Sequence, residues 1–139
     1  MTTRWLYRTA SILLVLFAAG HTLGFLQVDP QWRVDSLVQS MKSTQFNANG
    51  SERTYWDFYV GFGLFVSLFM VFAALLAWQI GNLPPATLVS MPIVRWGFAT
   101  CFAGLAYLSW RYFFLVPVIF SVLIFGCLTA AAWLAADQP

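Results

Sequence analysis

Four long apolar runs, almost free of charge, constrain the fold of this chain more than any other feature. They lie near residues 5–26, 55–80, 92–112 and 117–136. A helix needs about 20 mainly apolar residues to cross the hydrocarbon core of a bilayer. Of the 139 residues, 60% are hydrophobic and 9% are charged, and so few charges cannot cover the surface of a soluble domain. We therefore expect one all-α domain, an integral membrane up-down four-helix bundle.

The polar connection at residues 27–53 separates the first two runs. Its apolar residues recur at helical spacing, which predicts a short amphipathic interfacial helix lying on the membrane surface. These residues are Val34, Leu37, Val38 and Met41. The stretch "NANG" (residues 47–50) predicts a turn, and Ser51 is the expected N-cap of the second span. In the next connection, Pro84 and Pro85 should stop any helix.

Charge predicts the orientation in the membrane. Arg4 and Arg8 precede the first run, which favours cytoplasmic termini in a multi-pass protein of a bacterial inner membrane. The first run also resembles a signal peptide, but it stays apolar past the cleavage-like region, through Phe25 and Leu26. Tryptophans and arginines near the inner side predict an anchor belt with arginines that snorkel to the interface. This group is Trp5, Arg8, Trp78, Gln79, Arg95, Trp96 and Trp133.

His21 is the only histidine of the chain. From the rise of a helix, His21 should lie roughly 8 Å, and Asp57 roughly 6 Å, below the same membrane surface. Ionisable groups inside membrane segments are costly and usually have a partner. We therefore expect Asp57 to contact His21 and form an acid–base couple. In the alternative, Asp57 pairs with Arg53, and His21 donates to a nearby carbonyl.

Aromatic and basic side chains near the same layer predict a pocket for a lipophilic small molecule of isoprenoid, sterol or quinone type. Arg111 would hold an oxygen of this ligand, and Gly61 and Gly63 would either open space for it or permit close helix contact. The expected wall consists of Tyr55, Trp56, Tyr59 and Tyr112. An aromatic belt at the membrane interface explains the same residues without a ligand.

Two functions from different classes follow. In the first, the protein binds this lipophilic molecule and isomerises or cyclises it by acid–base chemistry at His21 and Asp57. In the second, it is a non-catalytic structural or accessory membrane subunit. Gly20 and Gly24 have the GxxxG spacing that lets helices approach closely, so this face would pack against another helix or form a homo-oligomer. Whether the chain is an enzyme stays open.

Cofactors and other partners are limited by composition. One histidine and the separated Cys101 and Cys127 cannot supply the four ligands of a structural zinc site, so we expect no metal and no cofactor. Haem bound through His21 is a minor alternative. The sequence contains no dense basic run of the kind that would indicate nucleic-acid binding. The expected partners are membrane lipids and the lipophilic ligand.

Three stretches carry a resemblance to known proteins. "GHTLGF", "YWDFYVGFGL" and "RYFFLVP" resemble an uncharacterised family of small bacterial four-span integral membrane proteins, over most of the chain. This resemblance implies the four-span architecture and no particular activity. The architecture is also similar to the emopamil-binding-protein group, which includes sterol isomerases. That likeness implies polar residues in a lipid-facing cavity, but no residue of this chain is matched to theirs.

Overall fold

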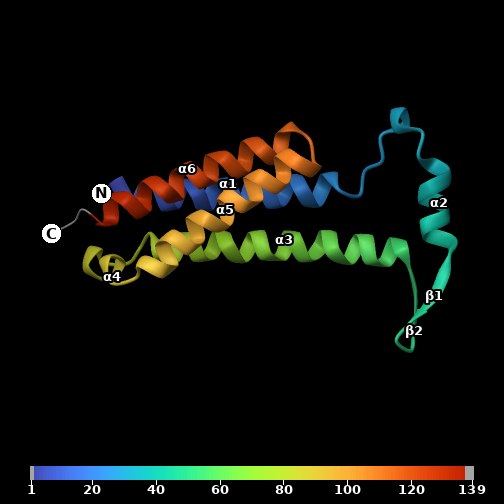
Figure 1. Cartoon of the computed structure of the whole chain (residues 1–139), viewed down its shortest axis with the longest axis horizontal. Coiled ribbons are helices and arrows are strands. Elements are labelled where there is room, and N and C mark those ends of the chain that lie inside the picture. Colours follow the sequence, from blue (N-terminus) through green and yellow to red (C-terminus); the bar gives the residue numbers. More distant parts are fainter. Residues whose placement is uncertain (1, 137–139) are drawn as a thin grey trace. The chain divides into compact units, whose positions relative to one another are not determined.

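The computed structural model describes residues 2–136, and most of them are helical (Figure 1). This part of the chain forms α1 (Thr2–Gly24), η1 (Pro30–Trp32), α2 (Asp35–Ser43), β1 (Gln45–Ala48), β2 (Ser51–Thr54), α3 (Tyr55–Ile80), α4 (Pro85–Val89), α5 (Pro92–Tyr112) and α6 (Leu115–Ala136). The element η1 is a single 3-10 turn, and β1 and β2 form a hairpin. The prediction of a helical protein is confirmed.

Three of these helices, α1, α3 and α6, are long and apolar enough to cross a membrane. They contain 23, 26 and 22 residues. Helix α5 is almost as long, at 21 residues, but it is not among the three. Arg95, Ser109 and Arg111 lower its apolar content. Three of the four predicted spans are thus confirmed as helices that could cross a membrane.

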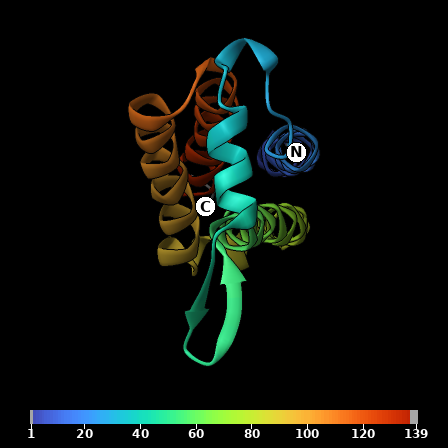
Figure 2. The ribbon, with the colours of Figure 1, turned by 90° about the vertical axis from the view of Figure 1, so that its right-hand side faces the viewer.

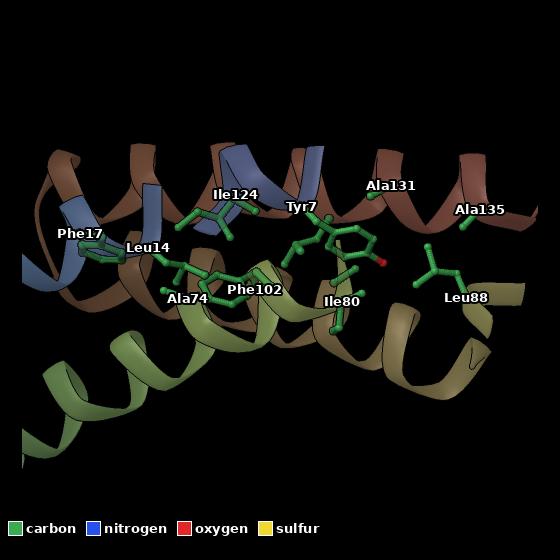
Figure 3. Close-up of a cluster of buried hydrophobic side chains, with 14 residues drawn as sticks. Tyr7, Leu14, Phe17, Ala74, Ile80, Leu88, Phe102, Ile124, Ala131 and Ala135 are labelled. Atoms are coloured by element: carbon green, nitrogen blue, oxygen red, sulfur yellow. The ribbon is translucent and has the colours of Figure 1, made fainter. Parts of the chain in front are cut away.

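The chain divides into two compact units, which we call unit 1 (residues 2–17 and 70–136) and unit 2 (Ala18–Phe69). Unit 1 contains a hydrophobic core to which α1, α3, α4, α5 and α6 all contribute (Figure 3). Its largest fully buried apolar side chains are Tyr7, Leu14, Ile124 and Leu128. Four long helices therefore share one core in this unit.

Helices α5 and α6 form an antiparallel hairpin and lie side by side (Figures 1 and 2). Buried alanines on α6, Ala131 and Ala132 among them, let neighbouring helices approach closely. The rings of Phe17 and Phe120 stack with centroids 5.1 Å apart and join α1 to α6. The Ser11 hydroxyl donates to a carbonyl of α3, that of Ala74, at 2.8 Å.

The connection after α3 differs from the prediction. Pro84 and Pro85 do not abolish helix here, because Pro85 is the first residue of the short helix α4. Proline is tolerated at this position since the N–H of the first helical residue has no helical partner. Gly81, just past α3, packs closely on α1: a Cβ added there would lie 2.9 Å from the Cβ of Tyr7.

Unit 2 contains a β-hairpin that was not predicted from the sequence. Its strands pair from Gln45 opposite Thr54 to Ala48 opposite Ser51, and Figure 2 shows the hairpin following α2. Asn49 and Gly50 have φ angles of 54° and 90°, as a type I′ turn requires at both central residues. The predicted "NANG" turn is therefore the tip of this hairpin.

Unit 2 also contains the predicted amphipathic helix. It is α2, and none of its residues is buried. Its apolar side chains, such as Leu37, which is 58% exposed, do not pack into a core of the described chain. Its position on a membrane surface stays a prediction.

Candidate functional site

His21 takes part in a polar contact between α1 and α3 within unit 2. Its Nδ1 lies 3.1 Å from the hydroxyl of Ser67. The hydroxyl of Thr22 lies 2.7 Å from both Ser67 Oγ and the Ala18 carbonyl, and Ser67 is 3.2 Å from the carbonyl of Gly63. Ser67 is buried. Ser67 was not predicted as a site residue, although it is the only serine in the apolar helix α3.

Phe25 lies next to this contact, just past the end of α1. Its ring stacks on the imidazole of His21 with centroids 5.2 Å apart. The same ring occupies the space beside Gly63, where an added Cβ would collide with it. The Tyr59 hydroxyl donates to the Phe25 carbonyl at 2.6 Å. Two predicted site residues, His21 and Tyr59, therefore meet at Phe25.

Asp57 caps α3 instead of contacting His21. The backbone N–H of Thr54 donates to its carboxylate at 2.8 Å, and the N–H of Asp57 donates to the Thr54 hydroxyl at 3.1 Å. This reciprocal arrangement is a capping box. The predicted N-cap, Ser51, lies in β2, so that prediction was wrong. Ser67, the partner of His21, is ten residues after Asp57, about 15 Å along a helix. Within residues 2–136, no hydrogen bond joins His21 to Asp57.

The aromatic residues at the start of α3 pack on one another and on the hairpin. The ring of Trp56 stacks on Tyr59 at 5.3 Å and carries the ammonium group of Lys42 over its face at 4.5 Å. The ring of Tyr55 lies 4.9 Å from that of Phe46 in β1. Tyr55 and Tyr59 remain well exposed. Such contacts suit rings at a membrane interface.

A groove of about 370 Å³ runs along the first part of α3 and is open on its outer side. Its lining consists of Ala48, Ser51, Arg53, Asp57, Phe58, Gly61, Phe62 and Phe65. Two predicted site residues, Asp57 and Gly61, belong to it. His21, Tyr55 and Tyr59 are not part of its lining. The charged side chains lie at one end, before and at the first turn of α3, and the phenyl rings follow.

The other predicted ligand residues, Arg111 and Tyr112, belong to unit 1. They form the last turn of α5, and both are exposed. The guanidinium of Arg111 lies over the Tyr112 ring, 5.3 Å from its centroid. A predicted role of Arg111 in holding a ligand oxygen stays a prediction.

The glycines of the predicted packing face on α1 are exposed. A Cβ added at Gly20 or Gly24 would meet no atom within 4 Å. The same holds for Gly61, which opens into the groove on α3. Of the four predicted packing glycines, only Gly63 has a close contact in the described chain, with Phe25.

Arg95 does not behave as a residue of the predicted anchor belt. Arg8 fits that prediction, because its guanidinium lies over the rings of Trp5 and Trp78 at 5.7 and 4.8 Å. Arg95 is instead buried, with 4% of its surface exposed. It donates to the carbonyl of Ala132 at 2.8 Å. Sequence alone did not distinguish a buried arginine from one that reaches the interface.

Neither a metal site nor a comparison with known proteins assigns an activity to these residues. Within residues 2–136, no three His, Cys, Asp or Glu side chains come close enough to hold a metal ion. Comparisons with protein-family models, curated proteins and solved structures found no match to the chain. The site must therefore be interpreted from its own geometry.

Proposed function

We propose that this chain is a multi-pass membrane protein that binds a lipophilic amphiphile in the groove on α3. The ligand would have an apolar body of isoprenoid, sterol or quinone type and a polar end. The observation that carries the proposal is the order of side chains along the groove. Arg53 and Asp57 lie at one end, and Phe58, Phe62 and Phe65 continue from it.

The change in polarity along the groove matches the change that α3 would meet in a bilayer. Phe65 lies eight residues after Asp57, about 12 Å along a helix. A helix that starts at the interface would carry the groove by this distance into the hydrocarbon core. The volume of about 370 Å³ falls within the range of small-molecule sites. Because the groove is open, a ligand could enter from the lipid phase.

In this proposal α1, α3, α5 and α6 cross the membrane in up-down order, and α2 lies on its surface. The shared core of the four long helices in unit 1 supports the bundle. No residue of α2 is buried, so its apolar side chains are free to contact lipid, which supports an interfacial position. Arg4 and Arg8 favour cytoplasmic termini, and a bacterial inner membrane is the proposed location.

The proposal does not include isomerisation or cyclisation by His21 and Asp57. An acid–base couple must lie within hydrogen-bond reach of one substrate. Asp57 lines the groove, whereas His21 bonds to Ser67 and is not part of the lining. The geometry therefore supports binding and assigns no reaction.

A second candidate function is that of an accessory membrane subunit. The exposed pair Gly20 and Gly24 favours it, because a Cβ at either position would meet no atom within 4 Å on an otherwise apolar helix. Another membrane helix, or a second copy of this chain, could approach α1 closely along this face.

A pair of glycine variants separates the two functions. Gly61→Leu would fill the groove, and Gly20→Leu would block the α1 face, each with the same added side chain at an open glycine. The purified protein is incubated with a membrane lipid extract, and retained molecules are identified by native mass spectrometry. Its oligomeric state is measured by analytical ultracentrifugation in detergent.

Amphiphile binding predicts that Gly61→Leu loses the retained molecule while Gly20→Leu keeps it. The subunit function predicts that Gly20→Leu lowers the associated fraction while Gly61→Leu does not. Retention that is equal in the wild-type protein and in Gly61→Leu would refute the groove as the binding site.

A further inference from the structure

The tip of the β-hairpin in unit 2 carries an asparagine that is followed by glycine (Figure 2). Asn49 alone among the three asparagines of the chain has this neighbour, since alanine follows Asn47 and leucine follows Asn82. Asn49 and Gly50 are both exposed. Water therefore reaches the side-chain amide of Asn49 and the peptide bond that joins the two turn residues.

The side-chain amide of an asparagine can react with the backbone nitrogen of the next residue. Once hydroxide has taken the proton of this nitrogen, the nitrogen attacks Cγ, a new C–N bond forms, and ammonia leaves with a proton from water. Water then opens the cyclic imide at one of its two carbonyls, which gives aspartate or isoaspartate. The net change is hydrolysis of the amide, without oxidation or reduction. Glycine hinders the attack least, because it has no Cβ.

The hairpin holds the nitrogen that would attack. The N–H of Gly50 donates to Asn47 Oδ1 at 2.7 Å, which is the short end of the range for such bonds. Asparagine side chains commonly bind the backbone of a turn in this way. The amide nitrogen of Asn47 donates to the Glu52 carboxylate at 3.4 Å. The Asn47 side chain therefore opposes loss of the proton that the reaction requires.

We propose that Asn49 is a site of spontaneous deamidation, and that Asn47 sets the rate by holding the N–H of Gly50. The reacting groups are the Asn49 amide, the Gly50 nitrogen and water. Asn47 forms and breaks no covalent bond in this reaction, so it is a positioning residue. Because the nitrogen must first lose a proton, the rate rises with pH.

Deamidation at the tip would also change the groove on α3. Ala48 and Ser51 flank the turn, pair with each other across the hairpin, and both line the groove. In isoaspartate the main chain runs through Cβ and Cγ, which lengthens the turn by one carbon atom. A type I′ turn joins its strands through two residues of ordinary length, so this pair would separate and the bound amphiphile would be released. This consequence rests on the proposed function, whereas the modification itself does not.

The test incubates the full-length protein in detergent, in mildly acidic and mildly alkaline buffer. Mass spectrometry of its peptides measures the exchange of NH2 for OH at each asparagine and separates isoaspartate from aspartate. Asn47→Ala removes the acceptor of the Gly50 N–H. Glu52→Ala is the matched control, because it removes the other contact of Asn47 and leaves that acceptor in place. Asn49→Gly removes the reacting amide, and glycine tolerates the positive φ of the turn.

We expect deamidation at Asn49 that is faster in alkaline buffer, while Asn82 stays unchanged. Asn47→Ala should accelerate it by about fivefold, the factor that corresponds to the loss of one hydrogen bond. Glu52→Ala should react at the wild-type rate, and Asn47→Asp should not accelerate the reaction, because a carboxylate also accepts from the N–H. An unchanged Asn49 in alkaline buffer, or equal rates in Asn47→Ala and Glu52→Ala, would overturn the proposal.

Ligand retention tests the effect on the groove separately. The wild-type protein should lose its retained amphiphile as isoaspartate accumulates, and Asn49→Gly should keep it through the same incubation. Retention that persists in the converted protein would refute the link between the turn and the groove. If no amphiphile is retained before incubation, the proposed function fails and the link with it, whereas the peptide masses still decide whether Asn49 is modified.

Discussion

Unit 1 and unit 2 differ in what they bury. Unit 1 encloses large side chains such as Ile124 and Leu128, which are fully buried. Within Ala18–Phe69, which makes up unit 2, only Ala18 and Ser67 are buried. Most of the rings along α3 in this unit are exposed instead. One unit is organised around a core, and the other is held by directed contacts.

Both units also carry exposed apolar side chains. Exposed apolar side chains cost little in a bilayer, because lipid tails are as apolar as the side chains themselves. In the proposed membrane setting, the exposed apolar surface of unit 2 would face lipid, the proposed ligand or another helix. Unit 1 encloses a core, but it also exposes large apolar side chains, among them Leu75, Ile93 and Leu115.

The largest expected effect is the loss of core packing in unit 1. Leu128→Ala removes a fully buried side chain and should lower the free energy of unfolding by about 2–5 kcal/mol. Leu68→Ala makes the same change in unit 2 at a residue that is 64% exposed, and should alter stability by about 0.5 kcal/mol or less. Thermal unfolding in one detergent measures both. Equal losses would remove the contrast between the units.

A smaller effect is expected at the glycine that accommodates Phe25. Gly63→Ala forces the Phe25 ring aside and should cost about 1 kcal/mol, the low end for overpacking, because the free end of the ring can swing away. Gly61→Ala is the matched control, since a Cβ there meets open space. NMR signals of the His21 ring, which stacks on Phe25, should move only in Gly63→Ala.

The capping box of α3 should contribute slightly less. Thr54→Ala removes the hydroxyl that accepts from the Asp57 N–H and should destabilise the protein by roughly 0.5–1 kcal/mol. Ser51→Ala, at the residue expected from sequence to be the cap, should be nearly neutral. Hydrogen exchange of the first turn of α3 should accelerate in Thr54→Ala alone. The opposite ranking would contradict the observed cap.

The smallest effect is expected at the His21 contact. Ser67→Ala removes its hydrogen bond to His21, and such bonds between membrane helices average about 0.6 kcal/mol. The nitrogen chemical shifts of the imidazole should change clearly even where the melting temperature does not. Asp57→Asn should leave these shifts unchanged. If Asp57→Asn changed the chemical shifts of His21, this result would support an acid–base couple of His21 and Asp57.

Much of the helical framework could be predicted from the sequence, because long apolar runs leave little choice of structure. Helices α3 and α5 have the expected ends, and α1 and α6 begin two or three residues before the predicted spans. The hairpin was missed although its signal, Asn49 and Gly50 together, is present. The cap was assigned to Ser51 although Thr54 and Asp57 have the spacing of a capping box.

The site was less predictable, because residue number gives depth only if the ends of two helices lie level. They do not lie level in unit 2. Tyr59 donates to Phe25, just past the end of α1, so the first turn of α3, with Asp57, extends beyond that end. Ser67 is therefore the partner of His21. The burial of Arg95 could not be predicted either, because the sequence around an arginine near the start of a helix is similar whether its side chain is buried or reaches the interface.

The two cation-paired tryptophans of α3 have a further consequence. Trp56 lies beneath Lys42, and Trp78 lies beneath Arg8. They are 22 residues apart on one helix, a rise of about 33 Å. Tryptophans anchor helices at both headgroup regions, so α3 would match a hydrocarbon thickness of about 30 Å while standing nearly upright. Thinner membranes would force it to tilt, and hydrophobic mismatch would then bias the protein toward thicker ones.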